Sequence, residues 1–197
     1  MPLGAFKAAL MGVAGVSTGD VVLLSSQTAD GDSTISFTSD ITSTYGEYIF
    51  RFYNINPATD AADFTFQANA TDSTSYDETM TTTTFEAYTS EDGSGSALGY
   101  VAGTDQAQGT SAQSLANGVG NAADESMLGE LHLFNPASTT YVKHFYARTN
   151  FYHASGIGYS VDTNSAGYIN TTTAIDDIKF YMSSGNFDGT IKMWGVK

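Results

Sequence analysis

Short runs of strand-forming residues, separated by turn signals, recur along most of this sequence. The runs are rich in Val, Ile, Thr, Tyr and Phe, and they either alternate apolar with polar side chains or are apolar throughout. Between them lie segments such as ADGDS, NPAS and SGNFDG, whose residues favour tight turns. This regular spacing predicts an all-β, antiparallel sandwich or barrel. We expect strands at residues 21–26, 34–38, 47–55, 63–68, 83–89, 129–135, 140–148, 175–183 and 190–196.

The composition narrows the class of protein. Acidic residues outnumber basic ones 21 to 7, so the net charge of -14 repels a phosphate backbone, and we expect no nucleic-acid partner. Aromatic residues make up 13% of the chain, which is enough for a folded core. Cysteine is absent, which excludes disulfides, thiolate nucleophiles and cysteine-ligated metal sites. No stretch of about 20 apolar residues is present, and we expect no membrane span.

Residues 1–20 differ from the rest of the chain. Their apolar side chains fall at spacings of three and four, as on one stripe of a short helix: Leu3, Phe6, Leu10 and Val13. An exposed apolar segment would favour aggregation, so we expect these residues to form an attachment arm that docks on a neighbouring subunit. The β-domain is then expected to span residues 21–197.

A secretory signal is the alternative interpretation of the same segment, because Lys7 precedes an apolar run at 8–16. Two features disfavour it. The basic residue follows apolar Leu3 and Phe6, and glycines interrupt the run. We therefore expect a retained arm.

Alternation within the predicted strands indicates which side chains face the core. Where apolar and polar residues alternate, the apolar residues are two positions apart and therefore point to the same face of the strand. The side chains expected in the core include Phe64, Phe66, Leu131, Leu133, Ile178, Phe180 and Met182.

The predicted strand at 47–55, EYIFRFYNI, is apolar on both faces, since Tyr48, Phe50 and Phe52 alternate with Ile49, Tyr53 and Ile55. Such a strand is either central in a layered stack or covered on its outer face by a partner subunit. Residues 97–125 show the opposite character, being small, polar and poor in aromatic side chains. They are predicted to form a long loop with a helical turn.

The sequence gives little support for catalysis or metal binding. The adjacent Asp176 and Asp177 would point to opposite faces of a strand, so they could not share a proton. We therefore expect no enzyme and no cofactor. The acidic turns ADGDS and SEDGSGS provide weak calcium candidates, but they lack the ligand spacing of an EF-hand, so solvated turn acids are the favoured interpretation. These candidates are Asp30, Asp32, Glu91 and Asp92.

Aromatic side chains outside the predicted core are the remaining functional signal. Exposed rings anchor protein interfaces or stack on sugars, and we favour subunit contact for them. The candidates are Tyr48, Tyr53, Tyr141, Tyr146, Tyr152 and Trp194.

Two segments resemble small β-sandwich virion proteins of tailed bacteriophages, particularly marine ones. They are GELHLFNPASTTYVKHFYARTNFYH and the terminal AIDDIKFYMSSGNFDGTIKMWGVK, in which a strand ends in a Ser-Ser-Gly-Asn turn and a Gly-Thr-Ile-x-x-aromatic-Gly strand follows. The resemblance covers about residues 47–197. It implies a jelly-roll domain displayed on a capsid or tail, and it implies no catalytic residues.

The resulting hypothesis is a non-enzymatic virion structural protein on the outer surface of a phage particle. It would be a capsid decoration or tail component with roughly eight to ten strands, forming homo-oligomers, most plausibly trimers, and contacting other virion proteins. The alternative is a carbohydrate-binding or receptor-binding module of a tail fibre or adhesin, with a host-surface glycan as its partner. A secreted calcium-dependent adhesin is a third hypothesis, and it requires a cleaved N-terminus.

Overall fold

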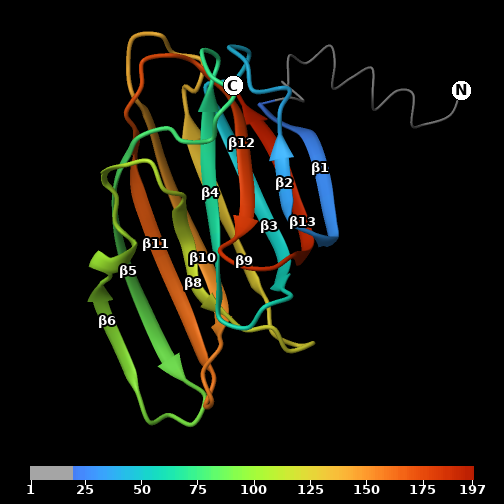
Figure 1. The fold of residues 1–197 in the computed structure, drawn as a ribbon, viewed down its shortest axis with the longest axis vertical. Coiled ribbons are helices and arrows are strands. Elements are labelled where there is room, and N and C mark those ends of the chain that lie inside the picture. Colours follow the sequence, from blue (N-terminus) through green and yellow to red (C-terminus); the bar gives the residue numbers. More distant parts are fainter. Residues whose placement is uncertain (1–19) are drawn as a thin grey trace, which may run out of the picture.

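Antiparallel strands account for most of the computed structural model, which describes residues 20–197 and forms two facing layers (Figure 1). The strands of the large layer lie in the order β1 (Val21–Asp32), β13 (Phe187–Val196), β3 (Glu47–Pro57), β9 (Met127–Phe134), β10 (Lys143–His153), β11 (Tyr159–Ile169) and β5 (Met80–Ser90). At the edge of this layer, β5 also pairs with two short strands, β6 (Ser96–Tyr100) and β7 (Ala107–Gly109). The small layer has the order β8 (Gln113–Val119), β4 (Ala62–Ala70), β12 (Ile175–Met182) and β2 (Thr34–Phe37). The two layers join where His153 of β10 pairs with Val119 of β8.

Eight of these strands pair in a nested order. β1 pairs with β13, β2 with β12, β3 with β9 and β4 with β8. This nesting is the jelly-roll arrangement of an antiparallel sandwich, so the all-β fold expected from the sequence is confirmed. The remaining strands are insertions. β5, β6 and β7 lie between β4 and β8 in the chain, and β10 and β11 lie between β9 and β12.

The core lies between the two layers and is built largely from aromatic rings. All the side chains that alternation assigned to it are buried. Phe180 is at its centre, with ring centroids 5.2 Å from Phe52 and 5.3 Å from Phe50, and it also contacts the rings of Phe37, Phe64 and Phe66. Rings of the large layer thus pack on rings of the small one, which holds the layers face to face.

Residues 20–197 contain thirteen strands where roughly eight to ten were expected, because four of them lack a recognisable strand pattern in the sequence. Residues 97–125 do not form a long loop: they contain most of β6 and all of β7 and β8, together with a 3₁₀ turn at Ala102–Thr104. β8 lacks a strong apolar pattern because one of its buried side chains is polar. The Gln113 amide accepts a hydrogen bond from the Thr82 hydroxyl at 2.7 Å and donates to the Thr104 carbonyl at 3.1 Å.

The strand that is apolar on both faces in the sequence is β3, and it lies centrally in the large layer, between β13 and β9. A register shift between Phe52 and Ile55, with Asn54 at φ 51°, makes a bulge in this strand. Strict alternation placed Ile55 on the outer face with Tyr53. The bulge turns Ile55 into the core instead, where it is fully buried, while Tyr53 stays outside.

The terminal strand β13 lies between β1 and β3, so it has no free edge. The Lys197 amide donates to the Asp20 carbonyl at 3.0 Å, which places both ends of the β-domain at one end of the large layer. No helix within residues 20–197 has the length and apolar character needed to cross a membrane.

One lysine is buried in the sandwich. Lys143 on β10 is fully buried, and its Nζ donates to the Thr171 carbonyl at 3.0 Å. Burial lowers the pKa of Lys143, against the opposing effect of nearby Glu78, and burial also raises the pKa of Glu78.

We expect Lys143→Met to raise the free energy of unfolding at pH 7, because it removes a charge whose burial opposes folding. At pH values between the lowered pKa of Lys143 in the folded state and the ordinary lysine pKa of about 10.4, this lysine is protonated in the unfolded chain but not in the folded one. The wild type therefore gains stability as pH rises through this range. The advantage of the variant should therefore shrink in alkali. Urea titrations of both proteins from pH 7 to pH 10 measure this difference, and a gap that widens with pH would contradict the assignment.

Candidate functional site

Exposed apolar side chains gather on the outer face of the large layer. Ten large apolar residues are exposed among the described residues, and all but Tyr141 and Ile157 lie on this face: Val21, Leu23, Tyr53, Phe85, Leu98, Tyr100, Leu128 and Tyr146. Strand register puts them there, because residues paired across neighbouring strands point to the same side. The face divides into two regions with different chemistry.

The first region, which we call the terminal patch, is a row of side chains across five neighbouring strands. The paired positions are Leu23, Trp194, Ile49, His132 and Tyr146, on β1, β13, β3, β9 and β10. The ring of Tyr146 stacks on His132 with centroids 4.5 Å apart and covers it. The Trp194 indole Nε1 is buried and has no hydrogen-bond partner within residues 20–197.

Carboxylates border the terminal patch. Glu47 Oε1 lies 2.5 Å from His132 Nδ1, and Glu130 Oε1 lies 3.3 Å from His132 Nε2. Burial, together with the negative charges of Glu47 and Glu130, raises the pKa of the Tyr146 phenol. The phenol therefore stays neutral at physiological pH, and the patch presents apolar rings with an acidic border.

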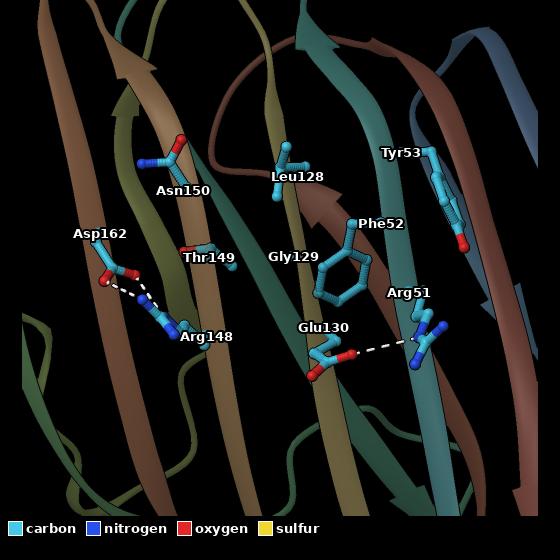
Figure 2. A pocket seen from close by; sticks show the side chains of 10 residues that line it. All are labelled: Arg51, Phe52, Tyr53, Leu128, Gly129, Glu130, Arg148, Thr149, Asn150 and Asp162. Atoms are coloured by element: carbon cyan, nitrogen blue, oxygen red, sulfur yellow. Dashed lines mark hydrogen bonds and ion pairs between the residues drawn. The ribbon is translucent and has the colours of Figure 1, made fainter.

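The second region is a depression of about 610 Å³ farther along the same strands, which we call the central groove. Figure 2 shows its charged side chains on four strands: Arg51, Glu130 and Arg148 lie in one row, and Asp162 lies in the next row, beside Asn150. Arg51 Nε lies 3.3 Å from Glu130 Oε2. Arg148 donates to both carboxylate oxygens of Asp162, from Nε at 2.9 Å and from Nη2 at 2.8 Å.

Asn150, Leu128 and Tyr53 form the next row of the central groove (Figure 2). The Lys192 ammonium lies 5.2 Å from the centroid of the Tyr53 ring, in a cation–π contact. A second depression of about 400 Å³ continues from the groove, shares Leu128 and Asn150 with it, and reaches Tyr152.

The structure places the predicted aromatic candidates in different environments. Tyr146 and Trp194 belong to the terminal patch, Tyr53 to the central groove and Tyr152 to its continuation, whereas Tyr141 is exposed in the loop before β10. Tyr48 requires a correction. It is fully buried, and its hydroxyl accepts from the Thr42 amide at 2.7 Å and donates to the Thr42 carbonyl at 2.9 Å, so it is a core residue.

The polar residues of the central groove were not predicted from the sequence. Alternation does put Arg51 outward with Tyr53, and Arg148 outward with Tyr146. Their partners Glu130 and Asp162 lie on other strands, and only the register between strands brings the four charges together. Local pattern does not encode that register.

The acidic turns use their carboxylates to hold the turns themselves. Asp32 Oδ2 accepts from the Asp30 amide at 3.1 Å, and Asp92 Oδ1 accepts from the Ser94 amide at 2.9 Å. The hydrogen bonds from Ser94 lower the pKa of Asp92. Within residues 20–197 no three His, Asp or Glu side chains are grouped to hold a metal ion. Glu91 lines the continuation of the central groove. The arm residues Leu3, Phe6, Leu10 and Val13 lie outside the described residues.

A scan of protein-family models and a search of curated proteins found no match to this chain. The jelly-roll fold and the two regions of the outer face are therefore the basis for a functional proposal.

Proposed function

We propose that this chain is a bacteriophage virion structural protein, displayed on the outer surface of the particle as a capsid decoration or tail component. It acts by assembling with copies of itself and with other virion proteins, and it catalyses no reaction. The terminal patch is the observation that carries the proposal, because one fold serves many functions and a specific surface is the better guide.

The terminal patch has the properties of an assembly surface. Leu23 is 45% exposed and continues the row of rings formed by Trp194 and Tyr146, and Val21, which is 54% exposed, lies beside it in the next row of the same face. Contiguous exposed apolar side chains with a polar border mark contact sites on proteins.

The position of the patch also supports attachment. It lies at the end of the large layer where residues 1–20 join β1 and where β13 ends. The arm and the patch can therefore act on the same neighbour. The net charge of -14 keeps a dense shell of such domains soluble, because the rest of the surface repels its copies.

The direct test of this function is the composition of the particle. Mass spectrometry of purified virions from the phage that encodes the gene should detect the chain, and antibodies against it should label intact particles. Virions that lack the chain, or a gene that belongs to no virus, would refute the proposal.

A variant tests the assembly surface. In light scattering, the full-length protein should have a mass that is a multiple of 20.8 kDa. The double substitution Leu23→Ser with Tyr146→Ser should shift this mass toward the monomer, because it removes apolar area from the terminal patch. The matched control is Leu98→Ser with Tyr100→Ser, which removes exposed apolar groups at β6, on the far edge of the same layer. Equal loss of assembly in both double variants would contradict a role specific to the patch.

A further inference from the structure

We propose that the central groove is a binding site for a short neutral oligosaccharide. This inference goes beyond a role in virion assembly and does not depend on it, because the groove lies in different rows of the outer face from the terminal patch.

The groove offers an apolar platform of the kind that packs against a sugar ring. Tyr53 is 39% exposed and Leu128 is 59% exposed, and both line the depression. A tyrosine ring presents a flat apolar body for the C–H face of a pyranose and a polar tip for its hydroxyls. The cation–π contact with Lys192 restrains the Tyr53 ring, which lowers the entropy cost of binding.

The charges of the groove are already matched within the protein. Arg51 is paired with Glu130, and Arg148 holds both oxygens of Asp162. These pairs supply fixed donors and fixed acceptors side by side, which suits hydroxyl groups because each one both donates and accepts.

Charge also argues against ionic ligands. An anionic ligand would have to displace Glu130 or Asp162 from its arginine and approach a protein of net charge -14. A cationic ligand in the groove would meet Arg51 and Arg148, whose carboxylate partners are already paired with them, and nearby Lys192, whereas Glu91 and Asp124 lie only in the continuation. A neutral, hydroxyl-rich ligand has neither cost.

Asn150 provides a directed acceptor. Its Nδ2 donates to the Ser160 hydroxyl at 3.0 Å and to the Val161 carbonyl at 2.9 Å, so its orientation is fixed. Its Oδ1 makes no hydrogen bond within residues 20–197 and remains open to a ligand hydroxyl.

The size of the site indicates how long the ligand is. Ligand pockets are about 300–1,000 Å³ in volume, and the central groove alone measures about 610 Å³. Its continuation toward Tyr152 adds about 400 Å³. Together they can hold more than one sugar ring, with Leu128 and Asn150 at the junction.

The test is a binding screen with the full-length protein. The probes are mono- to tetrasaccharides of glucose, galactose, mannose and N-acetylglucosamine, with sialylated and uronic-acid-containing counterparts. At least one neutral probe should bind, and its acidic counterpart should bind more weakly. In calorimetry with that neutral probe, Tyr53→Ala should weaken affinity about tenfold, and Asn150→Ala should weaken it several-fold. Tyr100→Ala, which removes an exposed ring outside the groove, should leave affinity unchanged.

Three outcomes would overturn the proposal: no neutral probe binds at millimolar concentration, only acidic probes bind, or Tyr53→Ala and Tyr100→Ala bind equally well. Particle incorporation and oligomeric state, measured on the Tyr53→Ala variant, separate this inference from the virion function. Both should be unchanged, so loss of sugar binding alone bears only on the groove.

Discussion

Phe180→Ala is expected to lower the free energy of unfolding of the β-domain by about 3–5 kcal/mol, the cost of truncating a fully buried phenylalanine. Phe180 is fully buried, and its ring contacts five other aromatic rings from β2, β3 and β4. The substitution removes those contacts and opens a cavity where the two layers meet. Because single domains are stable by only about 5–15 kcal/mol, much of the protein could unfold. Urea denaturation followed by intrinsic fluorescence measures the loss.

The adjacent Tyr181→Ala is the matched control for this prediction. Tyr181 also lies on β12, but alternation turns it outward, and it is only half-buried. Its truncation should cost clearly less than that of Phe180. If the Phe180→Ala protein unfolded at the same urea concentration as the wild type, this result would contradict the packing of Phe180 at the centre of an aromatic core between the layers.

Alternation in the sequence was sufficient for the core because burial and side-chain direction have the same period in a strand. The apolar side chains two positions apart on one strand face the opposite layer, as do Phe64 and Phe66 on β4 and Ile178 and Phe180 on β12. Every strand predicted this way is present. β11 shows the limit of the method. Its inward residues include Thr163 and Ser165, which are small polar side chains buried against β5, so no apolar alternation reveals the strand.

The functional surfaces were predicted less completely than the core. Tyr53, Tyr146 and Trp194 were found because alternation placed these aromatic side chains outside the predicted core. The central groove was missed because its charges come from four different strands, β3, β9, β10 and β11, of which β3 is distant in sequence from the other three. The four charged side chains come together only because of the register between these strands. A shift of one strand by one residue would turn its side chains to the opposite face of the sheet. The β3 bulge next to Tyr53 is one such shift, and it has no clear signal in the local pattern.

The two proposed surfaces are compatible because one rigid layer carries both. The terminal patch lies beside the chain ends, where attachment to a particle brings a neighbour close. The central groove lies farther along the same strands, on side chains fixed by ion pairs. A protein attached through its terminal end would therefore keep the groove open to solvent. The same strands would position both surfaces, so a defect in strand spacing should damage both.

Gly129→Ala should produce such a defect. A Cβ added at Gly129 on β9 would lie 2.4 Å from the Arg148 carbonyl oxygen and 2.8 Å from the Thr149 Cα on β10. Both contacts are with backbone, which cannot rotate away as a side chain can, so β9 and β10 must separate. Overpacking of this kind costs about 1–3 kcal/mol or more, and we expect the upper end of that range because the strands are central.

The separation should also increase the spacing between Arg148 on β10 and its cross-strand neighbour Glu130 on β9, and so deform the central groove, which Gly129 and Thr149 line. The variant should therefore lose stability in urea and also lose affinity for any saccharide that the wild type binds. Gly99→Ala on β6 is the matched control, because a Cβ there meets nothing within 4 Å. A Gly129→Ala protein as stable as the Gly99→Ala protein would show that β9 and β10 are not packed this closely.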